Sequence, residues 1–65
     1  MTASEFAERL AGVLVAHPGL SVTSAGIRHG AGIVNGALRP AVDVELAAGD
    51  CFRLLVDRVE LKPAP

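Results

Sequence analysis

The clearest pattern along the chain is an alternation with a period of two that begins at Ala41. Three apolar residues, Val42, Val44 and Leu46, alternate with polar or small ones, as in a strand that buries one face. A short turn follows, and a second alternation begins at Cys51. This pattern predicts an antiparallel hairpin with strands over about residues 37–47 and 51–61.

The length of the loop in this hairpin decides which residues face each other. A two-residue loop would set Leu46 opposite Arg53 and so mix core with charge. A three-residue loop over residues 48–50 sets Leu46 opposite Phe52 and Glu45 opposite Arg53. Opposite charges in such a pair contribute about 0.2–1 kcal/mol. We therefore expect the three-residue loop.

The alternation changes phase towards the end of the later strand, because Arg58 and Glu60 stand where apolar residues are expected. A β-bulge near Asp57 would return Val59 and Leu61 to the core face and carry the strand to residue 61. In the alternative, the strand ends near Asp57.

The N-terminal residues predict a helix over about residues 3–17. Thr2 and Glu5 have the spacing of a capping box, and Pro18 disfavours a helical conformation at the residue before it. His17, in the last helical turn, is expected to have a structural role. The apolar positions form one stripe that we expect to face the sheet: Phe6, Leu10, Val13, Leu14 and His17.

The stretch from Leu20 to Val34 has strand-like residues interrupted by glycines, and Asn35 and Gly36 follow it. Asn-Gly between two apolar stretches is the strongest short signal for a hairpin with a type I′ turn. This turn predicts a further strand over about residues 21–34. Its register pairs Ile33 with Leu38, Ile27 with Val44 and Arg28 with Asp43.

Pro40 conflicts with this hairpin, because proline removes a ladder hydrogen bond from a middle strand. Residues 29–40 therefore form either a bulged hairpin or an open loop, and the Asn-Gly pair favours the hairpin. Together the elements predict a single α+β domain over residues 1–65, an N-terminal helix packed on a three-stranded antiparallel meander (αβββ). We expect residues 62–65 to be a short tail.

Size and composition limit the core that such a domain can bury. A chain of 65 residues buries only about 60% of its unfolded surface, and only two residues here are aromatic. Scaffolds of this size often need a metal, disulfides or self-association. A single cysteine excludes an internal disulfide, and no Cys/His metal spacing appears. We therefore expect a homo-oligomer, a dimer or higher, with no metal and no cofactor.

Charge and targeting signals narrow the class of protein. The formal net charge of −1 provides no basic footprint for nucleic acid or an anionic membrane. No stretch approaches the about 18 apolar residues of a membrane span, and Glu5 and Glu8 stand where a signal peptide would be basic and then apolar. We expect a cytoplasmic protein, or a virion protein if a phage encodes it. The excess of Arg over Lys, with abundant Ala, Gly and Val, is typical of a GC-rich genome such as that of an actinobacterium or its phage.

Two motifs invite a catalytic or binding interpretation, and their context argues against both. The glycines between residues 30 and 36 resemble part of a dinucleotide-binding loop, but Asn35 stands where a third glycine is needed and a strand follows. Cys51 with a histidine resembles a nucleophile and base. The predicted register, however, places His29 on the core face and Cys51 on the outer face. We therefore predict no catalytic residue and no small-molecule substrate.

The outer face of the predicted sheet carries the candidate interface, because apolar side chains there lie beside glycines that let another surface approach. The interface residues are Gly26, Arg28, Gly30, Gly32, Val34 and Leu55. The sequence thus favours a small non-enzymatic structural or accessory protein that acts through protein–protein contact and self-association. The alternative is a nucleic-acid-binding or transcription accessory factor, whose arginines would have to converge on one face.

Overall fold

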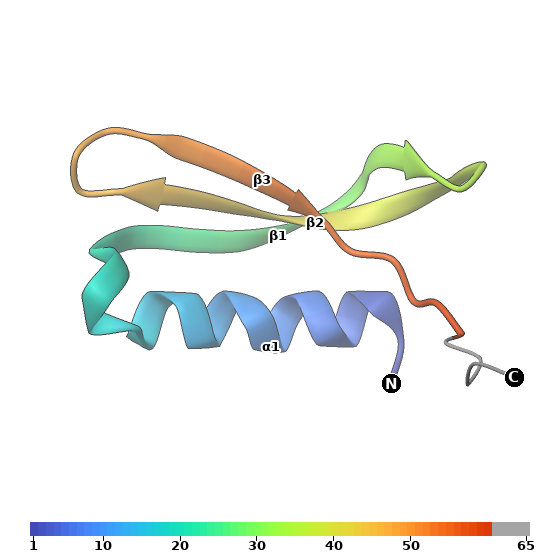
Figure 1. Ribbon diagram of the computed structural model, residues 1–65, viewed down its shortest axis with the longest axis horizontal. Helices are drawn as coiled ribbons and strands as arrows, with labels where there is room; N and C mark the ends of the chain where they lie inside the picture. The colour runs from blue at the N-terminus through green and yellow to red at the C-terminus, as the bar shows by residue number, and fades with distance from the viewer. Residues whose placement is uncertain (61–65) are drawn as a thin grey trace, which may run out of the picture.

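The computed structural model describes residues 1–60 as one helix packed on a three-stranded antiparallel sheet (Figure 1). The strands lie in the order β1-β2-β3, so each hairpin joins neighbours in the sheet. The predicted αβββ fold is therefore confirmed. In chain order the elements are α1 (Ala3–Ala16), the short 3-10 helix η1 (Pro18–Leu20), β1 (Val22–Val34), β2 (Ala37–Leu46) and β3 (Cys51–Leu55).

Local hydrogen bonds fix the start of α1 and cap the short helix η1 that follows it. The Thr2 hydroxyl accepts a hydrogen bond from the Glu5 N–H at 3.1 Å, which satisfies one of the free donors at the helix start. At the other end Pro18 begins η1, and Nδ1 of His17 accepts a hydrogen bond from the Gly19 N–H at 3.1 Å. His17 thus caps the short helix that follows, in agreement with the structural role predicted for it.

The Asn-Gly pair forms the predicted type I′ turn between β1 and β2. Asn35 and Gly36 have φ angles of 51° and 77°, the left-handed values that this turn requires at both central positions. Ile33 pairs with Leu38, as predicted. Residues 29–40 therefore belong to a hairpin and not to an open loop.

The register of this hairpin shifts where β1 meets Pro40. Residues 29–31 of β1 lie opposite this single residue of β2, so Ile27 pairs with Val42 and not with Val44. The shift is by an even number of residues, so Ile27 still lies on the core face, as predicted. The Pro40 carbonyl accepts a hydrogen bond from the Val56 N–H at 2.9 Å, so the missing N–H of Pro40 faces the segment after Leu55, where β3 has already ended.

The hairpin between β2 and β3 has the predicted loop length, but the loop lies one residue earlier, at residues 47–49. Gly49 has a φ of 96° and donates its N–H to the Leu46 carbonyl at 2.9 Å. This is the common three-residue loop in which a type I turn is followed by a left-handed residue. The observed pairs are Asp43 with Arg53 and Val44 with Phe52, in place of Glu45 with Arg53 and Leu46 with Phe52.

β3 is shorter than predicted. It ends at Leu55, and Val59 is 57% exposed instead of packed on the core face. The change of phase near Asp57 therefore marks the end of the strand. The position predicted for Leu61 and the tail predicted over residues 62–65 lie outside the described residues.

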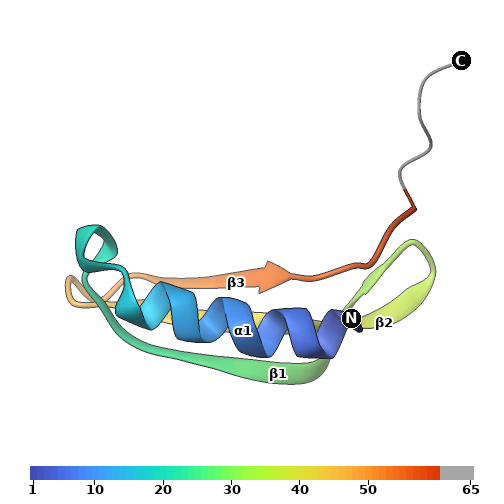
Figure 2. The same cartoon turned by 90° about the horizontal axis from the view of Figure 1, so that it is seen from below.

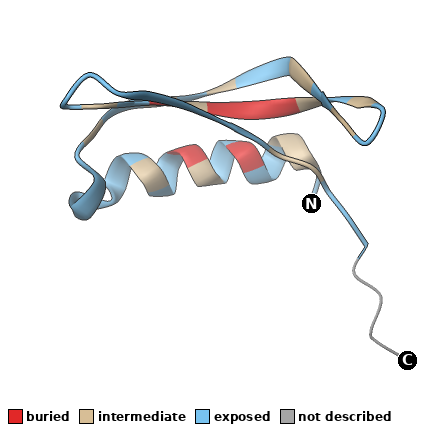
Figure 3. Ribbon diagram, turned by 45° about the horizontal axis from the view of Figure 1, so that its top comes forward, coloured by how far each residue is buried: buried red, intermediate tan, exposed pale blue. Residues whose placement is uncertain are grey.

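α1 packs on β1 and β2 and leaves β3 to one side (Figure 2). Two alanines of the helix, Ala7 and Ala11, pack with Val42 and Val44 of β2 in the centre of the core (Figure 3). Val42 is the largest fully buried side chain among the described residues. The core of a single chain is therefore thin.

The predicted apolar stripe of α1 is rotated relative to the face that the helix buries. Leu10 and Leu14 are half-buried against the core, but Phe6 and Val13 are 50% and 60% exposed, and His17 is exposed. Small alanine side chains let the helix approach the sheet closely, so the larger residues lie along its flank.

The hairpin of β1 and β2 is much longer than the helix that covers it. A helix of 14 residues spans about 21 Å, whereas the molecule is 43 Å long. Ile33 and Leu38, predicted to lie on the core face, are 70% and 67% exposed because they extend past the end of the helix. Only the half of the hairpin near η1 is therefore covered.

Candidate functional site

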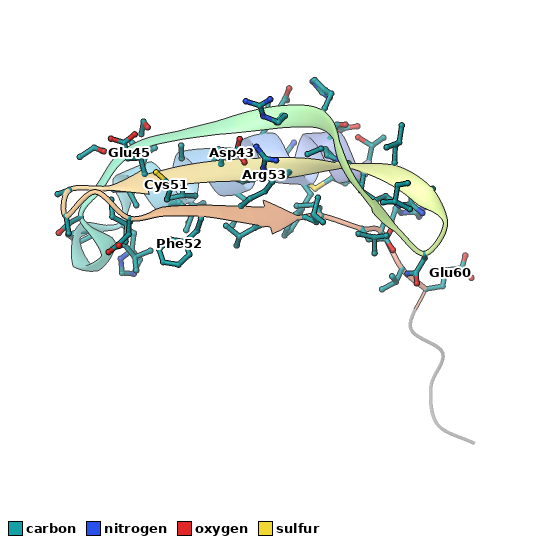
Figure 4. The ribbon with its side chains drawn as sticks, turned by 90° about the horizontal axis from the view of Figure 1, so that it is seen from above. Asp43, Glu45, Cys51, Phe52, Arg53 and Glu60 are labelled. Atoms are coloured by element: carbon teal, nitrogen blue, oxygen red, sulfur yellow. The ribbon has the colours of Figure 1, made fainter. Side chains whose placement is uncertain are left out.

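The predicted interface residues do not form one flat surface. The far half of β1 bends over β2 towards the β3 side (Figure 4), and the Leu55 side chain lies against Gly32, where two of its methyl carbons would be 3.1 Å from an added Cβ. Val34 is half-buried, and Ala41, which pairs with Leu55, is fully buried. Gly32 and Leu55 therefore contact each other within the chain.

The other predicted residues remain on the surface. Gly26 and Arg28 are exposed on the straight part of β1, and an added Cβ at Gly26 would meet no atom within 4 Å. Gly30 is exposed in the irregular part of the strand with a φ of 58°. That these residues contact a partner stays a prediction.

An aspartate held between two arginines dominates the outer face. Arg53 donates two hydrogen bonds to Asp43, at 2.7 and 3.0 Å, and the Arg28 Nε donates a third at 3.0 Å. Figure 4 shows the Asp43 and Arg53 side chains together on the face opposite the helix. The hydrogen bonds from Arg53 are the main reason that the pKa of Asp43 lies below its usual value; partial burial opposes this effect, and Arg28 adds to it.

A second ionic contact joins the segment after β3 to the hairpin. Asp57, only 13% exposed, accepts a hydrogen bond from the Asn35 amide at 2.9 Å, and its other oxygen lies 2.9 Å from the Arg39 Nε. That Nε also donates to the Val34 carbonyl at 3.4 Å, so its contact with Asp57 is ionic and not a directed hydrogen bond. The sequence pattern did not reveal this contact, since it depends on the bend of the hairpin.

The structure does not bring a nucleophile and a base together at Cys51. The thiol donates to the Gly49 carbonyl at 3.9 Å, and His17 is engaged with Gly19. His29, predicted on the core face, is exposed in the irregular part of β1. Within residues 1–60 no group of three His, Cys, Asp or Glu side chains could hold a metal ion, and no helix is long and apolar enough to cross a membrane.

The most distinctive surface lies on the helix side of the sheet, along β3. Phe52 and Leu54 pair with Val44 and Val42, so they lie on the same face as the core, yet they are 56% and 40% exposed. Their exposure follows from the position of α1, which packs on the other two strands. Figure 4 shows the Phe52 side chain projecting beyond the edge of β3.

The flank of α1 extends this apolar surface. Phe6 lines a hollow with Met1 and Val59, so the flank that carries Phe6 faces the segment after β3. Val13 lies two helical turns further along the same flank. We call this surface the apolar trough, and its exposed residues are Phe6, Val13, Phe52, Leu54 and Val59.

Sequence reasoning identified the residues of the trough as apolar but assigned them to the core. The numbers of predicted elements could have indicated this exposure. One helix of four turns is too narrow to cover all three strands of the sheet. Comparison with protein-family models, with curated proteins and with solved structures gives no match for this chain. The function is therefore inferred from the surfaces described above.

Proposed function

We propose that the chain is a small non-enzymatic structural or accessory protein that works through protein–protein contact and self-association. The observation that carries this proposal is the contrast between its core and its trough. Val42 is the only large side chain fully buried among the described residues, whereas two phenylalanines of the trough are at least half exposed. A surface of this kind marks a contact site in a soluble protein.

The energetics of a small domain support the same proposal. At this chain length the free energy gained from apolar burial roughly cancels the entropy cost of ordering the chain. The single cysteine provides no internal disulfide, and the described residues hold no metal cluster. Burial of the trough against another protein surface is the remaining way to add apolar contact.

The charge distribution gives less support to nucleic-acid binding. Arg28 and Arg53 are both bound to Asp43, and Arg39 lies against Asp57. Arg39 is paired one to one, and Arg28 and Arg53 share a single carboxylate, so together the three arginines leave one unbalanced positive charge to attract a phosphate. Binding to a labelled DNA or RNA oligonucleotide that weakens steeply with salt would nevertheless favour this alternative.

The test is the mass of the chain in solution, measured by light scattering during size exclusion over a dilution series and at two salt concentrations. We expect at least twice the mass of a single chain, nearly unchanged by salt because the contact is apolar. A single-chain mass at every concentration would overturn self-association. An actinobacterial or phage source, and a cytoplasmic or virion location, remain predictions from composition.

A further inference from the structure

We propose that the partner of the apolar trough is a second copy of this chain, joined to the first along the free edge of β3 as an antiparallel pair. The two sheets then form one six-stranded sheet with both helices on the same side. This inference rests on the proposed self-association and specifies its geometry.

The hydrogen bonds of β3 show which backbone groups face the free edge. The Asp50 carbonyl accepts a hydrogen bond from the Leu46 N–H at 2.8 Å, and the Val56 N–H donates one to the Pro40 carbonyl at 2.9 Å. Hydrogen-bonded pairs alternate along an antiparallel ladder, so Phe52 and Leu54 also direct their backbone groups towards β2. The N–H and C=O groups that point outward belong to Cys51, Arg53 and Leu55.

These outward groups determine the register of the pair. Only residues whose backbone groups point outward can form hydrogen bonds with the second copy. A twofold axis at Arg53 gives every one of these residues a hydrogen-bonded partner. Cys51 then lies opposite Leu55 of the second copy, and Arg53 lies opposite Arg53 of the second copy. Any other register leaves outward groups at the ends of the strand without a partner.

The same register places the trough residues together. Phe52 lies opposite Leu54 of the second copy in a non-hydrogen-bonded pair, the type in which side chains approach most closely. The helix-side face of both β3 strands becomes the floor of one apolar surface. The flanks of the two helices, with Phe6 and Val13, border this floor on either side.

The charges on the outer face are compatible with the axis. Two arginines directly opposite each other would normally repel. Each Arg53, however, makes contacts of 2.7 and 3.0 Å with its own Asp43, whose negative charge reduces this repulsion. The ion pair of the outer face therefore allows the arginines to meet.

The edge of β3 suits pairing better than that of β1. β3 pairs with β2 without any shift in register over its full length. β1 has two irregularities, and such bulges protect an edge by twisting it away from a partner. The helix-side face of its half near η1 is also already covered by α1.

The area of the trough is consistent with a dimer that dissociates on dilution. Phe6 and Phe52, each at least half exposed, present about 100 Å² apiece, or about 400 Å² for two copies. A specific interface needs about 1,000 Å². The remaining apolar side chains and the backbone of the paired strands have to supply the rest, so the interface falls in the small class.

Disulfide formation at the axis tests this geometry. Paired residues at the axis have Cα atoms about 5.5 Å apart, within the range of a disulfide, whereas Cys51 of the two copies would lie about 13 Å apart along the strand. The variant with Arg53→Cys and Cys51→Ser should therefore become a covalent dimer under mild oxidation. The wild type, whose exposed Cys51 lies on the same strand and face, is the matched control and should form several-fold less.

Light scattering on both proteins separates the outcomes. A dimer mass with a disulfide at residue 53 supports edge pairing. A dimer mass without preferential linkage at residue 53 overturns edge pairing but leaves self-association standing. A single-chain mass for both proteins overturns both proposals, provided that circular dichroism shows the variant to be folded.

Discussion

The side chain of Leu55 in β3 lies against Gly32 in the far half of β1, close enough that an added Cβ at Gly32 would come within 3.1 Å of it. β1 and β3 are not neighbours in the sheet, so this contact exists only because the long hairpin bends. Ala41, which pairs with Leu55, is fully buried, and Gly32 is partly buried.

Substitution of Gly32 should disturb this contact. We expect Gly32→Val to lower the free energy of unfolding by about 1–3 kcal/mol, because the added methyl groups displace Leu55. Gly26→Val is the matched control, since a Cβ there meets nothing within 4 Å and valine favours strands. Urea denaturation of both variants measures the difference. Equal stability of the two would show that Leu55 does not constrain the bend.

Asp57, in the segment after β3, should stabilise the same bend through its contacts with Asn35 and Arg39. Asp57→Ala removes the hydrogen bond to the Asn35 amide and leaves the half-buried Arg39 without its counter-ion. We expect a loss of about 1–3 kcal/mol in unfolding free energy. Glu60→Ala, at an exposed position in the same segment, should change it by less than about 0.5 kcal/mol. If Asp57→Ala loses as little stability as Glu60→Ala, the contacts of Asp57 do not stabilise the bend.

The lowered pKa of Asp43 predicts how stability depends on pH. A carboxyl with a lower pKa in the folded state stabilises the protein above its unfolded pKa, about 3.9, and this stabilisation is lost as the pH falls through the folded pKa. Wild type should therefore exceed Asp43→Asn in stability at pH 7, and the difference should shrink below about pH 4. Asp50→Asn, at an exposed position directly after the loop, is the control. A difference that persists unchanged at pH 2.5 would be inconsistent with ion pairing to Arg28 and Arg53.

The trough predicts which exposed apolar residue matters for association. Phe52→Ser should weaken dimer formation at least tenfold, because an aromatic residue in the centre of an interface carries much of its binding energy. Ile33→Ser is the control, since Ile33 is even more exposed but lies at the far end of the hairpin. Sedimentation equilibrium gives both dissociation constants. A larger effect of Ile33→Ser would move the interface to the hairpin tip.

The parts of the fold that depend on neighbours in sequence were predictable. The Thr2 cap and the Asn35-Gly36 turn both appear where the pattern indicated, because each needs only a few adjacent residues. The loop at residues 47–49 was also within reach. Gly49 occupies the third loop position, where a left-handed conformation favours glycine, and that signal would have given the correct register.

The ion pair between Arg28 and Asp43 was predicted from the wrong register. Gly26, not Arg28, lies directly opposite Asp43. The contact forms all the same, because a long arginine side chain can reach its diagonal neighbour on the adjacent strand. The ion pair therefore forms as predicted even though the predicted register was wrong by two residues.

The face that α1 buries could not be predicted from its apolar stripe. Phe6 and Val13 have more apolar surface than Ala7 and Ala11, so the pattern favours burial of the larger residues. The alanines are buried because they let the helix lie close to β2, and that fit depends on the sheet as a whole. The trough therefore became visible only in three dimensions.

Backbone hydrogen exchange at β3 tests the paired edge most directly. Phe52 directs its N–H towards β2, whereas Arg53 directs its N–H towards the free edge. In a concentrated sample we predict that both amides are protected from exchange, and that dilution releases Arg53 before Phe52. Fast exchange at Arg53 beside a protected Phe52, at every concentration, would contradict the pairing of two copies along β3.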